Sequence, residues 1–328
     1  MRFLHRLAGA LLLLHHPLSA SAQTVWDMTT EYPQSAMSGL GVTTFARHVA
    51  ALTAGKLLIE PSFDAAKGIR SADMLIAIAQ GRIQAGDAFA GALEAEDAIF
   101  ALPSLPFLVT SMADARRLAD LARPYLAAAL QSRGERLLYL TPWPPSGIWS
   151  KAPLKTPSDL SGLSIRTYDR ISREIFARAG ATATSIGFAE TLPRLVDGSI
   201  NAVLSSGDGD SGRRLWALLP YFSEITYSLP ISVASVNQAA YDGLPPDLRE
   251  AVDTASRRTE TDLWLALSTR LQENHRRMRE SGVTIDPDPA PALVAALQSG
   301  AAAAQQAWCE RAGPICQKIL GAFGPGKP

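Results

Sequence analysis

Residues 163–186 read LSIRTYDRISREIFARAGATATSI, and this stretch decides the fold class. Period-two alternation over Leu163–Tyr168 predicts a strand, because successive side chains of a strand point to opposite faces of a sheet. Ile171–Ala179 predicts a short helix that ends at Gly180, and Ala181–Ile186 predicts a second strand. A strand, a helix and a strand in this order are typical of a βαβ unit in an α/β fold.

The same alternation continues on both sides of this stretch. The segment 189–197 predicts a helix and 200–205 a strand, while 31–41 predicts a loop rich in small and polar residues. We therefore expect two α/β units with largely parallel strand pairing. Before residue 163 the expected strands are 24–29, 56–63, 83–91 and 136–141, and the expected helices are 43–53, 71–81 and 112–133.

A long helix follows the second unit. Pro245-Pro246 opens a helical pattern that reaches Glu280 and ends at Gly282. At 1.5 Å per residue this helix is about 50 Å long, which exceeds one small lobe, so it should brace two. The sequence thus predicts an α/β, two-lobe fold of the periplasmic-binding-protein kind. We expect lobe I to comprise residues 23–146 plus 235–275, and lobe II 147–234 plus 276–328; such proteins close like a hinge around a ligand.

The first residues form an export signal. Arg2 and Arg6 precede an apolar run over 7–14, and Ala20-Ser21-Ala22 fits a cleavage site. The run is shorter than the roughly 20 apolar residues that a membrane span needs. We expect residues 1–22 to be a signal peptide, and the mature protein to reach a bacterial periplasm without being embedded in the membrane.

The overall composition excludes two classes of protein. Of the 328 residues, 31 are Lys or Arg, 31 are Asp or Glu, and 47% are hydrophobic. Disordered chains combine low hydrophobicity with high net charge, and nucleic-acid binders usually carry a basic excess. The chain shows neither property, so we expect a globular protein without a nucleic-acid partner.

Cysteine and histidine are scarce. Cys309 and Cys316 predict a disulfide in an oxidising compartment, with two free buried thiols as the alternative. Removal of residues 1–22 leaves only His48 and His275. A zinc site needs about four ligands, and a Ser-His-Asp or Cys-His arrangement needs a well-placed histidine. We therefore expect no metal, no cofactor and no catalytic residue.

Arg166 is the leading candidate for ligand binding. It lies near the C-terminal end of its predicted strand, on the same face as Tyr168. Ligands of open α/β sheets bind at the carboxyl ends of strands, and a guanidinium can clamp a carboxylate with two parallel hydrogen bonds. The alternative is an internal ion pair with Asp169 or Asp208, and the residues alone weigh the two equally.

Further candidates lie on loops and strand ends. Residues 205–209 (SSGDG) form a small polar loop after a strand, where Ser206 and Asp208 could face a ligand, although an ordinary turn is the simpler interpretation. Residues 143–150 (WPPSGIWS) join the two units, so Trp143 and Trp149 could wall a pocket, with hinge packing favoured for one of them. Tyr32 and Phe89 end strands of the first lobe and could also face the cleft.

Taken together, several segments resemble the DctP-type periplasmic solute-binding proteins of TRAP transporters (tripartite ATP-independent periplasmic transporters). They are the helix and turn ending in TAGKL (53–57), SLPFL (104–108), DLSGLSIRTYD (159–169) and LVDGSINAVLSSGD (195–208). The resemblance implies a two-lobe receptor that binds small organic acids without catalysis and passes them to a membrane permease. It also places the family's carboxylate-binding arginine on Arg166.

One departure from the family bears on the ligand. Some members carry a second arginine just before the second lobe, where this chain has Pro145-Ser146-Gly147. A buried second carboxylate without a cation is costly, so we expect a monocarboxylate, such as a 2-oxo or 2-hydroxy acid with an apolar or aromatic remainder. Two alternatives remain: an exported hydrolase or isomerase using Asp208 with Arg166, and a ligand-binding partner of a sensor kinase.

Overall fold

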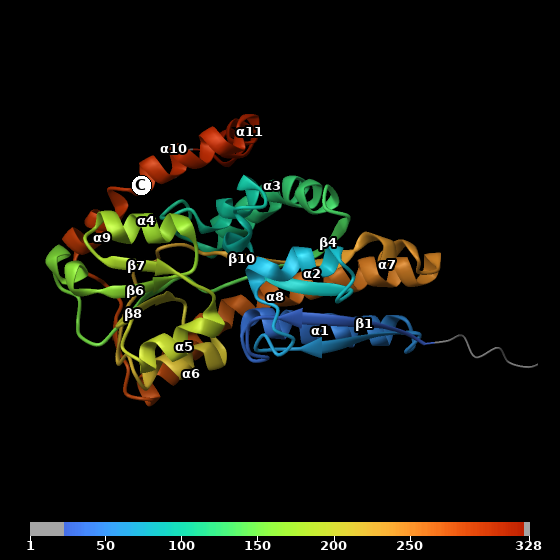
Figure 1. Cartoon of the computed structure of the whole chain (residues 1–328), viewed down its shortest axis with the longest axis horizontal. Coiled ribbons are helices and arrows are strands. Elements are labelled where there is room, and N and C mark those ends of the chain that lie inside the picture. Colours follow the sequence, from blue (N-terminus) through green and yellow to red (C-terminus); the bar gives the residue numbers. More distant parts are fainter. Residues whose placement is uncertain (1–22, 325–328) are drawn as a thin grey trace, which may run out of the picture.

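The computed structural model describes residues 23–324, and the expected signal peptide, residues 1–22, lies outside this range. The chain forms two lobes, each built on its own mixed β-sheet with helices around it (Figure 1). The α/β, two-lobe fold expected from the sequence is confirmed.

The first lobe contains a five-stranded sheet in the order β2-β1-β3-β10-β4. β1 runs parallel to β2 and β3, whereas β10 runs antiparallel to both β3 and β4. The expectation of largely parallel pairing is wrong for β10, because the chain enters this strand on its return from the other lobe. The strands are β1 (Thr24–Thr30), β2 (Leu57–Ser62), β3 (Ala85–Phe89), β4 (Glu135–Pro142) and β10 (Ile231–Asn237), and the helices of this lobe are α1 (Met37–Leu52), α2 (Met74–Ala79), α3 (Met112–Gln131) and α7 (Gln238–Asp242).

The second lobe contains a six-stranded sheet in the order β11-β9-β5-β8-β6-β7. β6 pairs in parallel with β7 and β8, as the βαβ pattern predicts, while β5 runs antiparallel to β8 and β9. The strands are β5 (Gly147–Ser150), β6 (Ser164–Thr167), β7 (Thr182–Ser185), β8 (Ala202–Ser205), β9 (Tyr221–Ser223) and β11 (Thr284–Asp286), and the helices are α4 (Arg170–Arg178), α5 (Phe188–Val196), α6 (Gly209–Trp216) and α9 (Pro291–Gln298).

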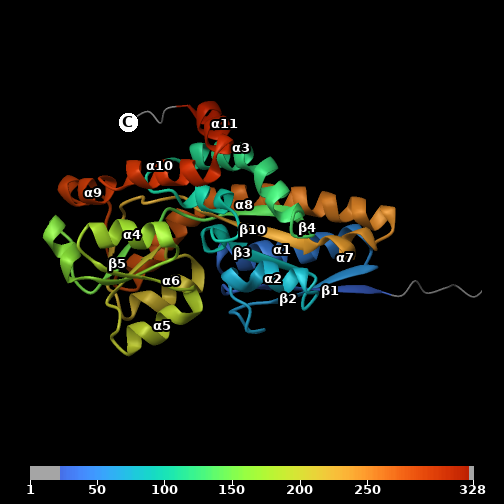
Figure 2. The same cartoon turned by 45° about the horizontal axis from the view of Figure 1, so that its top comes forward.

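A single helix, α8 (Pro246–Glu280), spans both lobes and has the limits that the sequence predicts (Figure 2). Its 35 residues begin with a proline at the first helical position and end before Gly282, which has a positive φ. Trp264 and Leu267 pack into the core that includes the first lobe, whereas Met278 lies in the core of the second lobe with Trp149. The helix therefore belongs to both lobes.

The lobe boundaries differ from the expected ones in two places. The expected change at 234/235 falls inside β10, which pairs along its whole length with strands of the first lobe. The expected assignment of 276–328 to the second lobe is wrong for α11 (Pro314–Phe323), which packs on α3. It is wrong in part for α10 (Ala301–Ala312), which packs on residues 98–104 of the first lobe and also contacts α4 of the second. Trp308 is fully buried there, and its Nε1 donates to the carbonyl of Ala98 at 2.7 Å.

A disulfide joins the two C-terminal helices. Cys309 lies near the end of α10 and Cys316 lies in the first turn of α11. Their sulfur atoms form a disulfide bond, as the sequence predicts. The loop that it closes includes Gly313, whose positive φ turns the chain between the helices.

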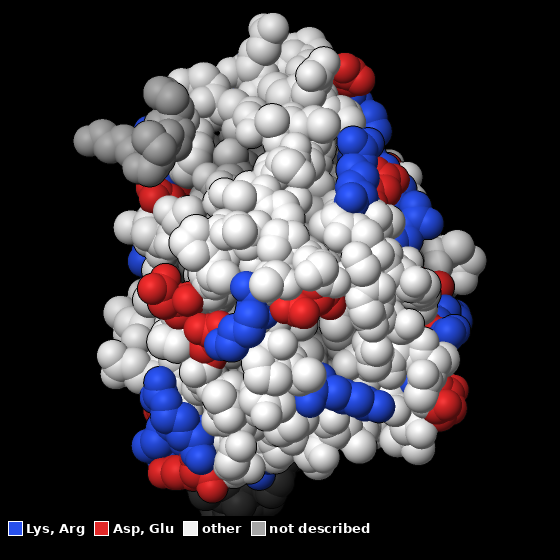
Figure 3. All heavy atoms as spheres, turned by 90° about the vertical axis from the view of Figure 1, so that its left-hand side faces the viewer, with Lys and Arg blue, Asp and Glu red and all other residues white. Residues whose placement is uncertain are grey.

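Two further features concern membrane-spanning helices and the distribution of charge on the surface. No helix within residues 23–324 is long and apolar enough to cross a bilayer. On the end of the second lobe, Lys and Arg side chains are interspersed with Asp and Glu side chains, and no large area of that face carries one sign (Figure 3).

Candidate functional site

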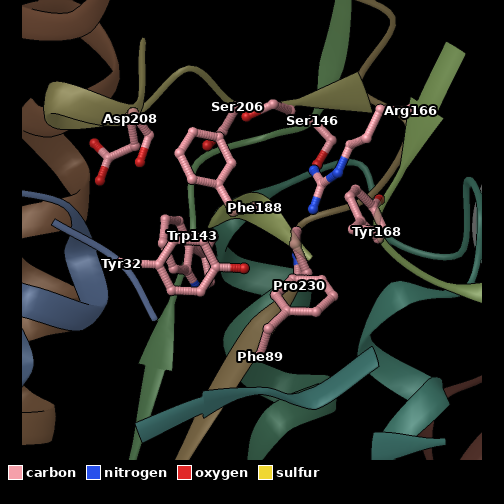
Figure 4. Close-up of a pocket in the computed structure, with 12 residues that line it drawn as sticks. Tyr32, Phe89, Trp143, Ser146, Arg166, Tyr168, Phe188, Ser206, Asp208 and Pro230 are labelled. Atoms are coloured by element: carbon pink, nitrogen blue, oxygen red, sulfur yellow. The ribbon is translucent and has the colours of Figure 1, made fainter. Parts of the chain in front are cut away.

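A pocket lies between the lobes, at the carboxyl ends of β6 and β8 (Figure 4). The enclosed part of its space is about 30 Å³, and the rest is open to solvent. Both lobes contribute, since the strand ends of the first sheet meet those of the second there. The lining residues are Tyr32, Phe89, Trp143, Ser146, Arg166, Tyr168, Phe188, Ser205, Ser206, Asp208, Ser211 and Pro230.

Arg166 brings a positive charge to this pocket. The side chain is 3% exposed, and its guanidinium points from β6 into the pocket, toward Tyr168 (Figure 4). Its Nε donates to the carbonyl of Ile186 at 2.9 Å, and its Nη1 donates to the carbonyl of Leu204 at 3.3 Å. A guanidinium has five N–H donors, so three remain for a ligand, including both on Nη2.

The guanidinium has no acidic partner among residues 23–324. Neither Asp169 nor Asp208 comes within ion-pair distance of it, so the internal ion pair considered as an alternative does not form. Asp169 instead caps α4, where it accepts a hydrogen bond from the backbone N–H of Ser172 at 2.7 Å. Burial lowers the pKa of Arg166 below its usual value, although nearby phenol and carboxyl groups oppose this shift. An arginine stays protonated in proteins, so the pocket holds a cation without an ion-pair partner among the described residues, although Glu31 and Asp169 act on it at longer range.

Aromatic rings form the walls around Arg166. Tyr32 packs on Trp143 with 4.6 Å between ring centroids, and Phe89 packs on Tyr168 at 5.0 Å. Phe188 lies 5.8 Å beneath the guanidinium carbon of Arg166. These rings give the space next to the charge mainly apolar walls, which suits a small acid with an apolar or aromatic remainder.

Trp149 does not belong to this wall, and its expected place in the pocket is wrong. It is fully buried in the second-lobe core, with its ring centroid 4.9 Å from that of Phe222. The cause is the packing on its face of the second sheet, where Leu215 of α6 and Met278 of α8 belong to the same core as Trp149. Of the two tryptophans in the joining segment, Trp143 lines the pocket and Trp149 packs the core.

Hydroxyl groups supply the remaining polarity of the pocket. Burial raises the pKa of Tyr32 and Tyr168 well above the usual value, so both phenols keep their protons. Tyr168 Oη lies 2.7 Å from Ser228 Oγ, while the Tyr32 hydroxyl points toward the centre of the pocket (Figure 4). Ser211 Oγ is buried without a hydrogen-bond partner in the described part of the chain. Such groups can position the polar atoms of a ligand.

Asp208 lines the pocket only with its backbone side, and its expected role as a ligand contact needs correction. Its carboxylate turns away from the cavity toward α1 and α8 (Figure 4). There it pairs with Arg270 at 2.6 Å and accepts from the backbone N–H of Met37 at 2.7 Å. This bond also explains why α1 begins at Met37, inside the expected loop: the N–H groups of a helix start need acceptors, and one comes from a residue 171 positions away.

The sequence analysis missed five lining residues: Ser146, Phe188, Ser205, Ser211 and Pro230. Two of them carried the signal that identified Arg166, namely a position at the carboxyl end of a strand. Phe188 follows the end of β7 and Ser205 ends β8. Pro230 carried no such signal. It lies just before β10, where the chain returns from the second lobe, and no local pattern in the sequence predicts that crossing.

The lobes are closed over the pocket. Glu31 of the first lobe accepts from the backbone N–H of Ala189 in α5 at 3.1 Å. Three ion pairs also cross between the lobes: Arg214 with Asp64 at 2.7 Å, Arg170 with Glu94 at 3.1 Å, and Arg70 with Glu190. Each aromatic side chain that lines the pocket is accordingly less than 10% exposed.

A chain of hydrogen bonds connects the Trp143 side chain to the buried carboxyl group of Asp87. Trp143 Nε1 donates to Ser232 Oγ at 2.9 Å, and Ser232 Oγ lies 3.1 Å from Ser38 Oγ. Ser38 and Thr141 both donate to the carboxylate of Asp87, which is fully buried. Burial raises the pKa of Asp87 to about 7, although hydrogen bonds from the hydroxyls lower it in part.

This pKa predicts a stability effect of Asp87→Asn that depends on pH. A folded pKa of about 7 lies above the unfolded value of roughly 3.9, so the carboxyl favours the folded state at low pH, and this contribution falls by about 1.4 kcal/mol per pH unit as the pH rises to about 7. Asn stays neutral, and the hydroxyls around it can rotate to donate or accept. In urea unfolding, we expect the variant to be more stable than wild type at about pH 8 and to lose that advantage at about pH 5. Equal differences at both pH values would contradict the argument.

Comparison with known proteins places this architecture in a family. Residues 28–308 match the DctP family, described as bacterial extracellular solute-binding protein, family 7. A crystal structure of DctP7 from Bordetella pertussis, an extracytoplasmic solute receptor binding pyroglutamic acid, is similar with 30% identity and a TM-score of 0.87, covering 92% of this chain and 99% of that one. A TRAP solute-binding protein from a marine metagenome, with co-purified pyroglutamate, is similar with 26% identity and a TM-score of 0.86, over 92% and 99% of the two chains.

A curated relative is more distant. The 2,3-diketo-L-gulonate-binding periplasmic protein YiaO of Escherichia coli is 26% identical over 194 residues, which is 57% of this chain and 58% of that protein. The match to the family, in contrast, covers both lobes and the whole of α8. The chain therefore belongs to the DctP family of bacterial extracellular solute-binding proteins, the TRAP solute receptors, and is a binding protein rather than an enzyme.

Proposed function

We propose that this chain is the periplasmic receptor of a TRAP transporter for a small monocarboxylate, which Arg166 binds through its carboxylate. The observation that carries the proposal is the buried Arg166 guanidinium, which has free N–H donors and no acidic partner among residues 23–324. An unpaired charge in such a place is unfavourable in the empty protein. A ligand carboxylate would neutralise this charge and accept two parallel hydrogen bonds from the free N–H groups of Arg166.

The charges that line the pocket favour a ligand with one negative charge. Arg166 is the one cationic side chain among the lining residues that the structure describes, and Arg270 neutralises Asp208 outside the cavity. A second carboxylate would face aromatic rings and serine hydroxyls. Burial of a charge without a cation costs several kcal/mol, on the order of 2–7 kcal/mol even for a neutral polar group.

The shape of the pocket favours a compact, flat acid. Tyr32, Trp143 and Phe188 offer ring faces, and the hydroxyls of Tyr32 and Ser211 have room for polar atoms of a ligand. Pyroglutamate combines one carboxylate with a five-membered lactam ring, and it is the ligand named for three similar structures at 26–30% identity. It is our first candidate. 2-Oxo acids come next, because a relative from Nostoc, 26% identical, is named a monocarboxylate 2-oxoacid-binding periplasmic protein.

The mechanism of transport follows from closure of the lobes. A ligand that binds the closed form better than the open form shifts the population toward the closed form. Since α8 belongs to both lobes, it connects them continuously while they rotate relative to each other. The closed receptor would then deliver the acid to the membrane permease, which must favour the open form to release it.

Calorimetric titration with a panel of acids tests the ligand class. We expect L-pyroglutamate or a 2-oxo monocarboxylate to bind with a Kd of about 1 μM or tighter, which is about −8 kcal/mol. Malate and succinate should bind at least about a hundredfold more weakly, because their second carboxylate lacks a cation and 1.4 kcal/mol corresponds to a factor of ten. Pyroglutaminol, which replaces the carboxylate by an alcohol, serves as the control and should not bind. Tight binding of succinate, or of an uncharged sugar, would contradict the proposal.

A further inference from the structure

The most deeply buried ion pair that joins the lobes lies beside the pocket and not at its rim. The Asp208 carboxylate is fully buried. It accepts from Arg270 Nε at 2.6 Å, from Asn274 Nδ2 at 2.8 Å and from Met37 N at 2.7 Å. Asp208 belongs to the second lobe, two residues after the pocket residue Ser206, whereas Met37 begins α1 of the first lobe. One carboxylate thus connects the ligand-facing loop to the other lobe and to the helix that spans both.

The backbone around Asp208 makes the same connection. The N–H of Asp210 donates to Ser35 Oγ at 2.9 Å, and Arg270 Nη2 donates to the carbonyl of Ser35. Gly209 has a φ of +56°, and a Cβ at this position would come within 2.5 Å of the Ser35 carbonyl oxygen. Residues 208–210 therefore dock directly on residues 35–37, and the close approach requires glycine between the two aspartates.

Exposure separates this docking contact from two of the three ion pairs that cross the lobes; in the third, Arg170 with Glu94, the glutamate is 11% exposed. Arg214 and Asp64 are 39% and 45% exposed, and Arg70 and Glu190 are 46% and 36% exposed. Exposed pairs contribute roughly 0–1 kcal/mol each, because water screens them. Arg270 is 14% exposed and Asp208 is 0% exposed. Loss of one partner of such a buried pair leaves an uncompensated charge, so we expect this contact to contribute more to the closed form than the exposed pairs do.

From these contacts we infer that Asp208 is a positioning residue: it holds the closed form by joining the ligand-facing loop to the start of α1 and to α8, and it does not touch the ligand. The inference rests on the proposed function, because it assigns how the acid becomes trapped once Arg166 has bound it. It predicts that Asp208 controls mainly how fast the ligand leaves. Association, which begins in the open form, depends much less on this contact.

Stopped-flow tryptophan fluorescence of the full mature chain with L-pyroglutamate, or with the tightest acid of the panel, tests the inference. We expect Asp208→Asn to raise the dissociation rate at least about tenfold and to change the association rate less than about threefold, as for other buried charge pairs. Asp64→Asn is the matched control: it removes the exposed pair with Arg214, at the same kind of position across the lobes. It should change both rates less than about twofold.

Gly209→Ala is a second variant that leaves every charge in place. Its added Cβ would meet the Ser35 carbonyl oxygen of the first lobe in this closed structure. Opening of the lobes would relieve this contact, so the variant too should speed dissociation. Distances between spin labels on the two lobes give an independent readout: both variants should shift the population toward the open form at equal ligand saturation. A purely structural role of Asp208 would instead lower the unfolding midpoint without changing this population.

The outcomes separate the inference from the proposed function. Wild-type dissociation rates and lobe distances in Asp208→Asn, with the acid still bound, would overturn the inference alone. A wild-type protein that binds none of the acids would overturn the proposed function and the inference with it. If Asp208→Asn does not fold, Arg270→Gln removes the same ion pair from the side of α8 and carries the same expectation.

Discussion

Replacement of Arg166 by Met abolishes acid binding while the ligand-free protein stays at least as stable as wild type. The loss of affinity should exceed about 3 kcal/mol, more than a hundredfold, because the variant strands a buried carboxylate without its charged donors. Stability should not fall, because the wild-type guanidinium is buried with no acidic partner among residues 23–324 and an apolar side chain of similar volume removes this cost. Calorimetry with L-pyroglutamate and urea unfolding of the ligand-free protein measure the two effects.

Arg173→Met is the matched control for this experiment. Arg173 lies on α4, 46% exposed, and its nearest acidic partner is Glu174 at 3.7 Å. Its replacement removes a positive charge from the same lobe without touching the pocket, so affinity should stay within about threefold. Unchanged affinity in Arg166→Met would exclude the carboxylate clamp. A large loss of stability in Arg166→Met would show that its bonds to Ile186 and Leu204 matter more than its unpaired charge.

Gly207→Ala should destabilise the protein by about 3 kcal/mol or more and weaken ligand binding. Gly207 has a φ of +66°, which is unfavourable for alanine. The added Cβ would also lie 2.2 Å from Cζ2 of Trp149, and Trp149 is fully buried between β8 and β9. The ring has no free space to move into, so the loop that carries Ser206 must shift. Urea unfolding and calorimetry measure the two losses.

Gly198→Ala separates the contact from the backbone conformation. Gly198 has a φ of +79°, and no atom lies within 4 Å of its hypothetical Cβ. Its replacement should cost about 1 kcal/mol, from the backbone alone. A similar cost for both variants would mean that Trp149 adapts to the added methyl group, and that the second-lobe core is looser than its close packing indicates.

Local patterns in the sequence predicted the elements well where the element depends on its own residues. The limits of α8 follow from a proline at its start and a glycine after its end, both of which act within one turn. Arg166 was found because alternation and strand ends are local properties, and the structure places it in the pocket with Tyr32, Phe89, Trp143, Tyr168 and Ser206. Its role as a carboxylate clamp remains a proposal.

The same patterns failed where distant residues decide. The start of α1 depends on a carboxylate 171 positions away. Trp143 and Trp149 belong to one short segment with similar sequence surroundings, yet only core side chains from distant elements, such as Met278 of α8, determine that Trp149 is enclosed. The C-terminal helices carry no signal for the lobe on which they pack, because an amphipathic helix can cover either lobe.

By itself, then, the sequence determined the alternation of strands and helices, the long helix across two lobes and the strand end that carries the guanidinium, since each of these depends on side-chain periodicity and on capping residues within a few positions. Only the tertiary structure decided that Arg166 has no acidic partner in the described chain and that Asp208 turns away from the ligand toward Met37 and Arg270. The physical reason is that the ion-pair partner of a charged side chain depends on which distant segments the closed lobes bring together. Local sequence patterns contain no information about such contacts.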